Sequence, residues 1–418
     1  MAFAAFLAYL VFVLIRPQEF IPALHNAPVV RVALICAALL QLLQKNKRYD
    51  GPQSVFLLFL LVVIFVSAVL NGWVGGGIFS SVEMLTTAVL PFFIVVNAVS
   101  TRAKLVATFV ALLVAAMFMV SNSLSQVASI DGIGWAGVPM QGGNRAAYLG
   151  IFNDPNDLSM YLIMVLPLVA FLFTRASKLV KPLLIVGMVA IVYGVYLTNS
   201  RGGLLGVFAL LGFWFLQRYG MAKSIALGAF VVPAALLAMS KFRAIDPDEQ
   251  SASQRLEAWY EGFQMLFSNP IFGVRQGAFL DYHYLTAHNS IVLVLAELGL
   301  LGYLCWYGFV FFSTLGPVTL WNKKIGGLIA ENAQKFDRDA GRALTYSMLA
   351  FAVTGFFLSR SYSLILYIFC GLMVASFYIA VPREPGGRSI TLREYSGVFV
   401  ATYFGSIITV YLVAKIFL

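Results

Sequence analysis

Long apolar segments recur along almost the whole chain and are separated by short polar ones. A transmembrane α-helix needs about 17 to 25 predominantly apolar residues to cross roughly 30 Å of hydrocarbon, where only its internal hydrogen bonds satisfy the backbone. With the short first segment counted or left out, the pattern predicts 13 or 12 such helices in a single integral membrane domain over residues 1–418. The predicted spans lie near residues 2–16, 29–44, 54–72, 82–100, 104–123, 157–175, 180–198, 202–217, 222–240, 289–314, 344–359, 361–381 and 396–416.

The composition leads to the same class. Hydrophobic residues make up 61% of the 418 residues and charged residues only 11%, and the mean hydropathy is +0.87. A soluble domain has no interior large enough to bury so much apolar material. We therefore expect an all-α polytopic protein whose surroundings are a lipid bilayer.

Basic residues gather in alternate connections between the predicted spans. They are Lys45, Lys47 and Arg48; Arg102 and Lys104; Arg175, Lys178 and Lys181; Arg218 and Lys223; Lys323 to Arg342; and Arg383, Arg388 and Arg393. The positive-inside rule places these connections, including a loop over 316–343, in the cytoplasm. Two long connections, 124–156 and 241–288, then face outward. The net charge of +10 reflects this topology, and nucleic acid is not an expected partner because no basic run is interleaved with aromatic residues.

The cysteines and histidines predict neither a metal site nor a bound cofactor. Cys36, Cys305 and Cys370 fall inside predicted spans, and the three histidines are too scattered for a helical metal motif. The chain also lacks a glycine-rich phosphate loop after a strand and a serine nucleophile elbow.

An amphipathic helix is predicted in the second long outer connection, over residues 251–267. Its apolar residues, spaced three and four apart, are Leu256, Trp259, Tyr260, Phe263, Leu266 and Phe267. We expect it to lie on the membrane surface. Arg255 precedes Trp259 by one turn, which would hold its guanidinium beside an aromatic ring at headgroup level. In the alternative interpretation, Arg255 only reaches lipid phosphate.

Two further arginines face outward in the predicted topology. Arg201 stands where one span ends and the next begins with Gly202 and Gly203, and Arg275 follows Gly273. Guanidinium groups bind phosphate oxygens bidentately, so three arginines together suit a pyrophosphate. The alternative for Arg201 is a structural role in the hairpin.

His288 lies where the outer connection enters a long apolar segment. Helical spacing places Gly299 and Gly302 near the face of His288 and Glu297 on the opposite side, and glycines there permit close helix packing. A histidine with an ordinary pKa near 6.5 can act as a general base. A structural role for His288 is the alternative.

These residues resemble the O-antigen ligase family, which is part of a superfamily with O-antigen polymerases and bacterial protein O-oligosaccharyltransferases. The family pattern of histidine, then Asn, Ser or Gln, nine residues and Gly-x-x-Gly is matched by His288, Asn289, Gly299 and Gly302. Arg201 and Leu205 match its arginine, three residues, leucine pattern, Arg255 looks like the arginine of its long periplasmic loop, and residues 153–157 are also similar. Val274-Arg275 departs from the second glycine often found there, which puts a ligand contact by that loop in doubt.

The resemblance implies a GT-C-like glycosyltransferase of the bacterial inner membrane with its active site facing the periplasm. It would transfer a glycan from undecaprenyl pyrophosphate to the lipid A core oligosaccharide without a metal ion. Arg201 and Arg255, helped by Arg275, would bind the pyrophosphate, and His288 would be the catalytic base of an inverting reaction. Asn289 and Trp259 would orient their neighbours. Asp281 is the alternative base.

Other functions remain open at this point. A polymerase that joins glycan repeats, or a transferase to protein, would use the same donor site and differ only in the acceptor. A transporter is the more distant alternative, because charges at mid-span and two related halves are expected there and neither is evident. The sequence does not specify the glycan, the acceptor sugar or the oligomeric state.

Overall fold

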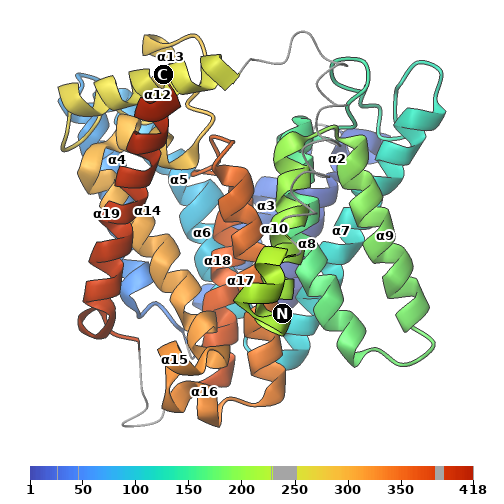
Figure 1. The fold of residues 1–418 in the computed structure, drawn as a ribbon. Coiled ribbons are helices and arrows are strands. Elements are labelled where there is room, and N and C mark those ends of the chain that lie inside the picture. Colours follow the sequence, from blue (N-terminus) through green and yellow to red (C-terminus); the bar gives the residue numbers. More distant parts are fainter. Residues whose placement is uncertain (26, 46, 227, 229–251, 382–389, 418) are drawn as a thin grey trace.

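The computed structural model describes residues 1–25, 27–45, 47–226, 228, 252–381 and 390–417. This part of the chain is helical throughout its regular structure, with two isolated β-bridges and no strand (Figure 1). Seven of its helices are long and apolar enough to cross a membrane, and four more apolar helices are shorter. The predicted class, an all-α polytopic membrane protein, is confirmed.

The helices pack together as a bundle, and their order along the chain is as follows. The first half contains α1 (Ala2–Leu10), η1 (Val11–Ile15), α2 (Pro17–Phe20), η2 (Pro22–Leu24), α3 (Val29–Leu42), α4 (Pro52–Leu70), α5 (Val74–Met84), η3 (Leu85–Val89), α6 (Leu90–Ala98), α7 (Arg102–Ala128), η4 (Gly150–Phe152), α8 (Pro155–Arg175) and α9 (Lys181–Leu197). The second half contains α10 (Arg201–Tyr219), α12 (Ala252–Ser268), α13 (Phe279–Tyr282), α14 (Ser290–Trp321), α15 (Lys323–Gly326), α16 (Leu328–Asn332), α17 (Lys335–Gly355), α18 (Leu364–Ala380) and α19 (Leu392–Phe417).

Most predicted spans correspond to helices, with shifted ends. The predicted span 222–240 lies largely outside the described residues. The predicted loop 316–343 is too long, because α14 continues to Trp321 and α17 already begins at Lys335. Asp337, in the first turn of α17, is buried and paired with Arg102 at 2.7 Å. This ion pair holds the first turn of α17 against the end of the bundle, where hydropathy alone predicts a solvated connector.

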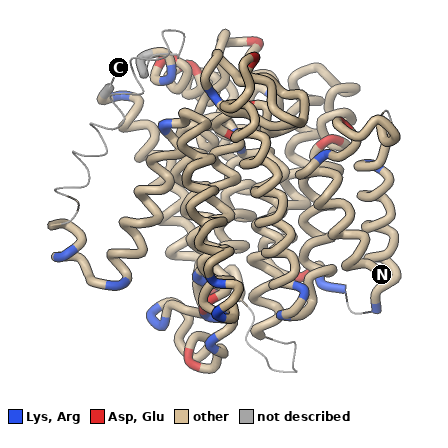
Figure 2. Tube along the Cα trace, turned by 90° about the vertical axis from the view of Figure 1, so that its right-hand side faces the viewer, with Lys and Arg blue, Asp and Glu red and all other residues tan. Residues whose placement is uncertain are grey.

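The polar connections lie at the two ends of the bundle, and few charges lie between them (Figure 2). At one end, the ion pairs of Arg102 with Asp337 and of Arg175 with Asp339, at 2.7 and 3.1 Å, join connections that the charge pattern places on the same side. At the other end, the ion pair of Arg360 with Asp154, at 3.1 Å, joins the connections before α8 and before α18. Each of these ion pairs joins connections that the charge pattern assigns to one side.

The predicted amphipathic helix is present as α12, but part of its apolar face is covered by protein. Trp259, Phe263 and Leu266 are buried, and the ring of Phe263 lies 5.2 Å from that of Tyr411 in α19. Tyr260 and Phe267 are exposed. The expectation that the whole apolar face rests on the membrane is therefore wrong, because half of it packs on the bundle.

The expected continuous helix after His288 is also wrong. Gly299 has φ 66° and ψ −168°, so α14 consists of two helices joined at a break. The segment that follows α12 pairs with this break: the Leu300 N–H donates to the Pro270 carbonyl at 2.8 Å, and the Arg275 N–H donates to the Glu297 carbonyl at 2.9 Å. A Cβ on Gly299 would lie 2.5 Å from the Ile271 backbone. The glycine therefore admits a loop backbone, and it does not extend the face of His288.

Gly302 has a related role just beyond the break. A Cβ on Gly302 would meet the side chain of Leu298, which the break folds over this position. His288 precedes the first residue of α14, so a helical count of positions from His288 to Gly299 and Gly302 does not apply.

Candidate functional site

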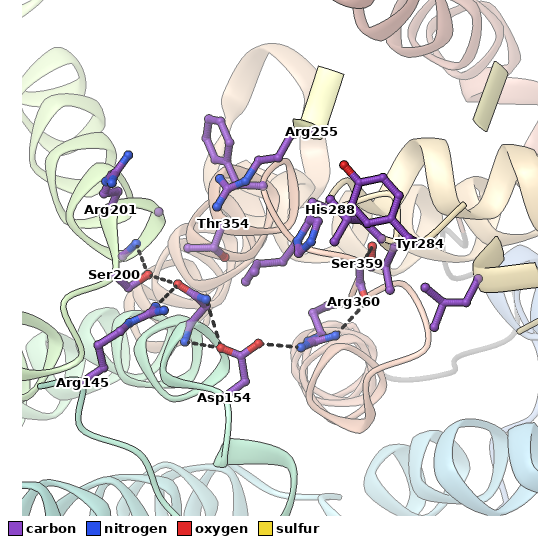
Figure 3. Close-up of a pocket in the computed structure, with 18 residues that line it drawn as sticks. Arg145, Asp154, Ser200, Arg201, Arg255, Tyr284, His288, Thr354, Ser359 and Arg360 are labelled. Atoms are coloured by element: carbon purple, nitrogen blue, oxygen red, sulfur yellow. Dashed lines mark hydrogen bonds and ion pairs between the residues drawn. The ribbon is translucent and has the colours of Figure 1, made fainter. Parts of the chain in front are cut away.

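A polar cavity of about 500 Å³ opens where the connections before α8, α10, α14 and α18 meet (Figure 3). Four arginines and one aspartate line it, so its wall carries more positive than negative charge. Its lining residues are Arg145, Asp154, Asn156, Ser200, Arg201, Gly202, Gly203, Arg255, Leu280, Tyr284, Leu285, Thr286, His288, Thr354, Phe357, Leu358, Ser359 and Arg360.

Three helices begin at this cavity, and each has a polar N-cap residue. The side chains of Asp154, Ser200 and Asn289 accept hydrogen bonds from the first-turn N–H groups of α8, α10 and α14. Helix N-termini carry partial positive charge. Together with the arginines, they make the cavity suited to an anion.

His288 is held in an uncommon backbone conformation immediately before α14. Its φ is 44°, in the left-handed region, which a residue other than glycine seldom adopts without support from its surroundings. Asn289 provides that support. Its Oδ1 accepts from the N–H groups of Ile291 and Val292, at 2.8 and 3.1 Å, and its Nδ2 donates to the Phe356 carbonyl at 3.0 Å.

The imidazole of His288 is neutral at physiological pH. Partial burial, together with the positive charges of Arg255 and Arg360, lowers the pKa of His288 to about 4, although Asp154 acts in the opposite direction. A neutral ring keeps a lone pair with which it can accept a proton.

The segment between α17 and α18 is bonded to the start of α14. The Ser290 hydroxyl donates to the Leu358 carbonyl at 2.7 Å and accepts from the Arg360 N–H at 3.0 Å. The Ser361 hydroxyl donates to the Ser290 carbonyl at 2.6 Å. These bonds fix the position of Arg360 relative to His288.

Arg360 binds both carboxylates at the start of α8. Its Nε donates to Asp157, and its second nitrogen lies 3.1 Å from Asp154. Asp154 also accepts the Asn156 N–H at 2.8 Å. Because both carboxylates are bonded to one guanidinium, neither is presented as a free nucleophile.

Arg145 extends this network toward α10. One of its nitrogens donates to Asn156 Oδ1 at 3.0 Å, and its Nε donates to the Thr198 carbonyl at 3.3 Å. The Ser200 hydroxyl donates to the same Asn156 oxygen at 2.8 Å. Arg145, Asn156, Ser200 and Asp154 are thus linked along one wall of the cavity, as Figure 3 shows.

The structure brings three of the predicted residues to this cavity: Arg201, Arg255 and His288. In Figure 3, Arg255 lies between Arg201 and His288. Gly203 lets α10 approach α8 closely, because a Cβ there would collide with the Ser159 hydroxyl. Trp259 lies outside the lining, and its ring packs edge-on against Phe356 at 5.3 Å, where it supports the segment bonded to Asn289.

Arg275 does not line the cavity. Its guanidinium pairs with Asp281 at 2.7 Å and lies 4.4 Å from the centre of the Trp73 ring. The expectation that Arg275 joins Arg201 and Arg255 is corrected by this placement. Asp281, the alternative base, is engaged in the same pair and also does not line the cavity.

Arg145 and Arg360 also line the cavity, although neither belongs to the histidine or arginine motifs of the sequence. Arg360 is the one residue left between the predicted spans 344–359 and 361–381, and a charge between two apolar helices is a signal that could have been used. For Arg145 the sequence offers no comparable signal beyond its place in a long outer connection.

Fold and site together define a polytopic α-helical membrane protein with an arginine-rich cavity at one end of its bundle. Residues 186–307 match the family described as O-antigen ligase. The match supports membership of the O-antigen ligase family, as the histidine and arginine motifs predict. It includes Arg201, Arg255 and His288, whereas Arg145 and Arg360 lie outside it. No curated protein matches the chain.

Proposed function

We propose that this protein is an inverting glycosyltransferase that moves a glycan from undecaprenyl pyrophosphate to the lipid A core oligosaccharide. Family membership supports a ligase or polymerase activity on glycans. The observation that carries the finer proposal is the meeting of His288 with four arginines in one cavity of about 500 Å³.

The arginines fit the leaving group of such a donor. A pyrophosphate carries several negative charges, and guanidinium groups form charge-assisted, bidentate bonds with its oxygens. Arg201 and Arg255 belong to separate helices that face the cavity. They would bind the pyrophosphate between them and stabilise the charge that develops as it leaves.

His288 provides the base for the acceptor. Its neutral imidazole would accept the proton of the acceptor hydroxyl while the hydroxyl oxygen forms a bond to the anomeric carbon. The bond from that carbon to the pyrophosphate oxygen breaks, and the electron pair leaves with undecaprenyl pyrophosphate. Attack opposite to the leaving group inverts the anomeric configuration, and it needs no second carboxylate as a nucleophile.

The charge distribution supports a periplasmic position for this cavity. Arg102, Arg175 and the basic residues of α15 and α17 lie at the other end of the bundle, where Arg102 pairs with Asp337 and Arg175 pairs with Asp339. Placing that end in the cytoplasm satisfies the positive-inside rule. A lipid-linked donor and a membrane-anchored acceptor would then meet at the periplasmic face of the inner membrane.

The test is transfer with purified full-length protein in lipid nanodiscs. The donor is an undecaprenyl pyrophosphate-linked glycan, offered either with core lipid A or alone, to wild type, His288→Ala and the control His25→Ala, whose histidine is exposed and outside the cavity. Product on core lipid A from wild type and His25→Ala, but not from His288→Ala, is expected. Glycan lengthened from donor alone would instead identify a polymerase, and product from His288→Ala at the wild-type rate would remove the base from the proposal.

A further inference from the structure

A second cavity, of about 610 Å³, adjoins the first. Ser359 and Arg360 line both cavities. The rest of the second cavity is formed by α1, η1, α3, α5, η3, η4, α8 and α18 and by residues of the connections between helices. It is therefore a separate space on the side of the N-terminal helices, in contact with the site through Arg360.

Both π-helices among the described residues contribute to this second cavity. Val13 belongs to η1, and Thr86 and Thr87 belong to η3. π-Helical turns within α-helices are rare and occur frequently at functional sites. The presence of two π-helical turns in the lining of one cavity therefore indicates a binding role. This indication is separate from the volume of the cavity.

Charged side chains also face the second cavity. Glu83 lies within the candidate span Val74–Ala98, and Arg31 lies in the first turn of α3. Both are exposed and line the cavity, and neither has an ion pair within 4.0 Å among the described residues. An ionisable residue within a span marks a substrate site by default, since its placement there is costly.

The cavity opens at the surface that the lipid would cover. Val32 and Val82, the chain neighbours of Arg31 and Glu83, are apolar and 51% and 53% exposed. Val13, Leu34 and Leu364 add apolar side chains to the same lining. A lining that is part apolar, part charged fits an amphiphile with its own polar head better than a bare hydrocarbon chain.

We propose that this second cavity binds the acceptor, a membrane-anchored glycolipid that carries phosphate. Arg31 would bind its phosphate, Glu83 and the threonines of η3 would bind sugar hydroxyls, and the apolar side chains of the lining would contact its hydrocarbon. The inference rests on the proposed function, since transfer needs two substrates and the first cavity is assigned to the donor. The shared residues Ser359 and Arg360 mark where the acceptor hydroxyl passes toward His288.

The experiment compares Thr87→Trp, which fills the cavity, with Val82→Trp, an exposed position on the same span that does not line it. Initial transfer rates of full-length protein in nanodiscs give KM for each substrate. The proposal expects acceptor KM to rise at least tenfold in Thr87→Trp with donor KM within twofold, and no change in Val82→Trp. Glu83→Gln, which changes the side-chain volume little, is also expected to raise the acceptor KM. It is the alternative test if Thr87→Trp does not fold.

Two results would overturn the proposal: a rise in donor KM instead of acceptor KM, which assigns the cavity to the donor lipid, and no change in either constant. A separate binding experiment distinguishes failure of the acceptor-site proposal from failure of the proposed function. A core lipid A probe with a diazirine on its sugar head is cross-linked to wild type and the attachment sites are mapped. Labelling of cavity residues that is lost in Thr87→Trp supports the site even if wild type transfers no glycan, and labelling elsewhere or none refutes it.

Discussion

The backbone N–H of Arg360 donates a hydrogen bond to the hydroxyl of Ser290 at 3.0 Å, and this bond connects the two halves of the site. Ser290 follows His288 by two residues, whereas Arg360 binds Asp154 and Asp157 at the start of α8. The Ser290 hydroxyl therefore helps to link the proposed base to the network that shapes the other wall of the cavity.

Ser290→Ala is expected to lower both stability and activity. The change removes both hydrogen bonds of the Ser290 hydroxyl and leaves the Leu358 carbonyl and the Arg360 N–H bonded to each other at 3.1 Å. Each lost hydrogen bond is expected to cost about 0.5–1.5 kcal/mol. Thermal unfolding in detergent and transfer rates measure the two effects. The control is Ser396→Ala, whose exposed hydroxyl bonds only within α19. Wild-type values for Ser290→Ala in both assays would show that this link is unimportant.

The pH dependence of transfer reports the state of His288. Because the pKa of His288 is lowered to about 4 by burial and by Arg255 and Arg360, kcat/KM, which reports the free enzyme, is expected to stay level from pH 7 downward and to fall only as pH passes about 4. A bound pyrophosphate would offset the arginine charges and raise this pKa. The acid limb of kcat is therefore expected at higher pH than that of kcat/KM.

The measurement is initial rates across pH 3.5 to 8, with unfolding followed at each pH so that loss of structure is not mistaken for titration. An acid limb in kcat/KM that persists unchanged when Arg255 is replaced by Gln would disagree with the assigned cause, since removing that positive charge should move the limb to higher pH.

Arg255→Ala and Arg275→Ala are expected to differ, although both arginines lie in the same stretch between α10 and α14. Arg255 lines the cavity, whereas Arg275 pairs with Asp281 outside it. Losing a hydrogen bond to a charged group costs about 1.5–3 kcal/mol, so Arg255→Ala should lose roughly 10- to 100-fold in kcat/KM for the donor. Arg275→Ala should stay within about threefold. Equal losses in the two variants would mean that Arg275 reaches the donor after all.

Local sequence was sufficient for most of the described helices and for part of the site. Apolar length predicts the spans, and the motifs around Arg201, Arg255 and His288 indicate three side chains that the fold brings to one cavity. Periodicity within a segment, however, carries no information about which connections meet across the bundle. Arg360 could be noticed as a lone charge, but its contacts with Asp154 and Asp157 join residues about 200 positions apart.

The prediction for Gly299 and Gly302 was wrong for a different physical reason. Counting positions from His288 assumes an unbroken helix, and a strongly apolar sequence favours that assumption because every residue there suits a membrane span. The break depends on the backbone of the segment after α12, which supplies the carbonyls of Pro270 and Ile271 to the N–H groups of Leu300 and Leu301. Such a contact is set by the fold of another segment, so no local pattern reveals it.

Gly299→Ala tests this account of the break. At φ 66° and ψ −168°, Gly299 occupies a region essentially restricted to glycine, where another residue costs roughly 1–3 kcal/mol. The added Cβ would also lie 2.5 Å from the Ile271 backbone, so the loop must move. We expect a clear fall in melting temperature and loss of transfer.

Gly212→Ala is the matched control, because Gly212 lies within α10 with nothing inside 4 Å of an added Cβ, and replacing a glycine in compatible helical geometry should raise stability by about 0.4–1 kcal/mol. If Gly299→Ala had the same melting temperature as Gly212→Ala, α14 would be a continuous helix through Gly299. His288 would then lie on the same helical face as Gly299 and Gly302, as the sequence predicts.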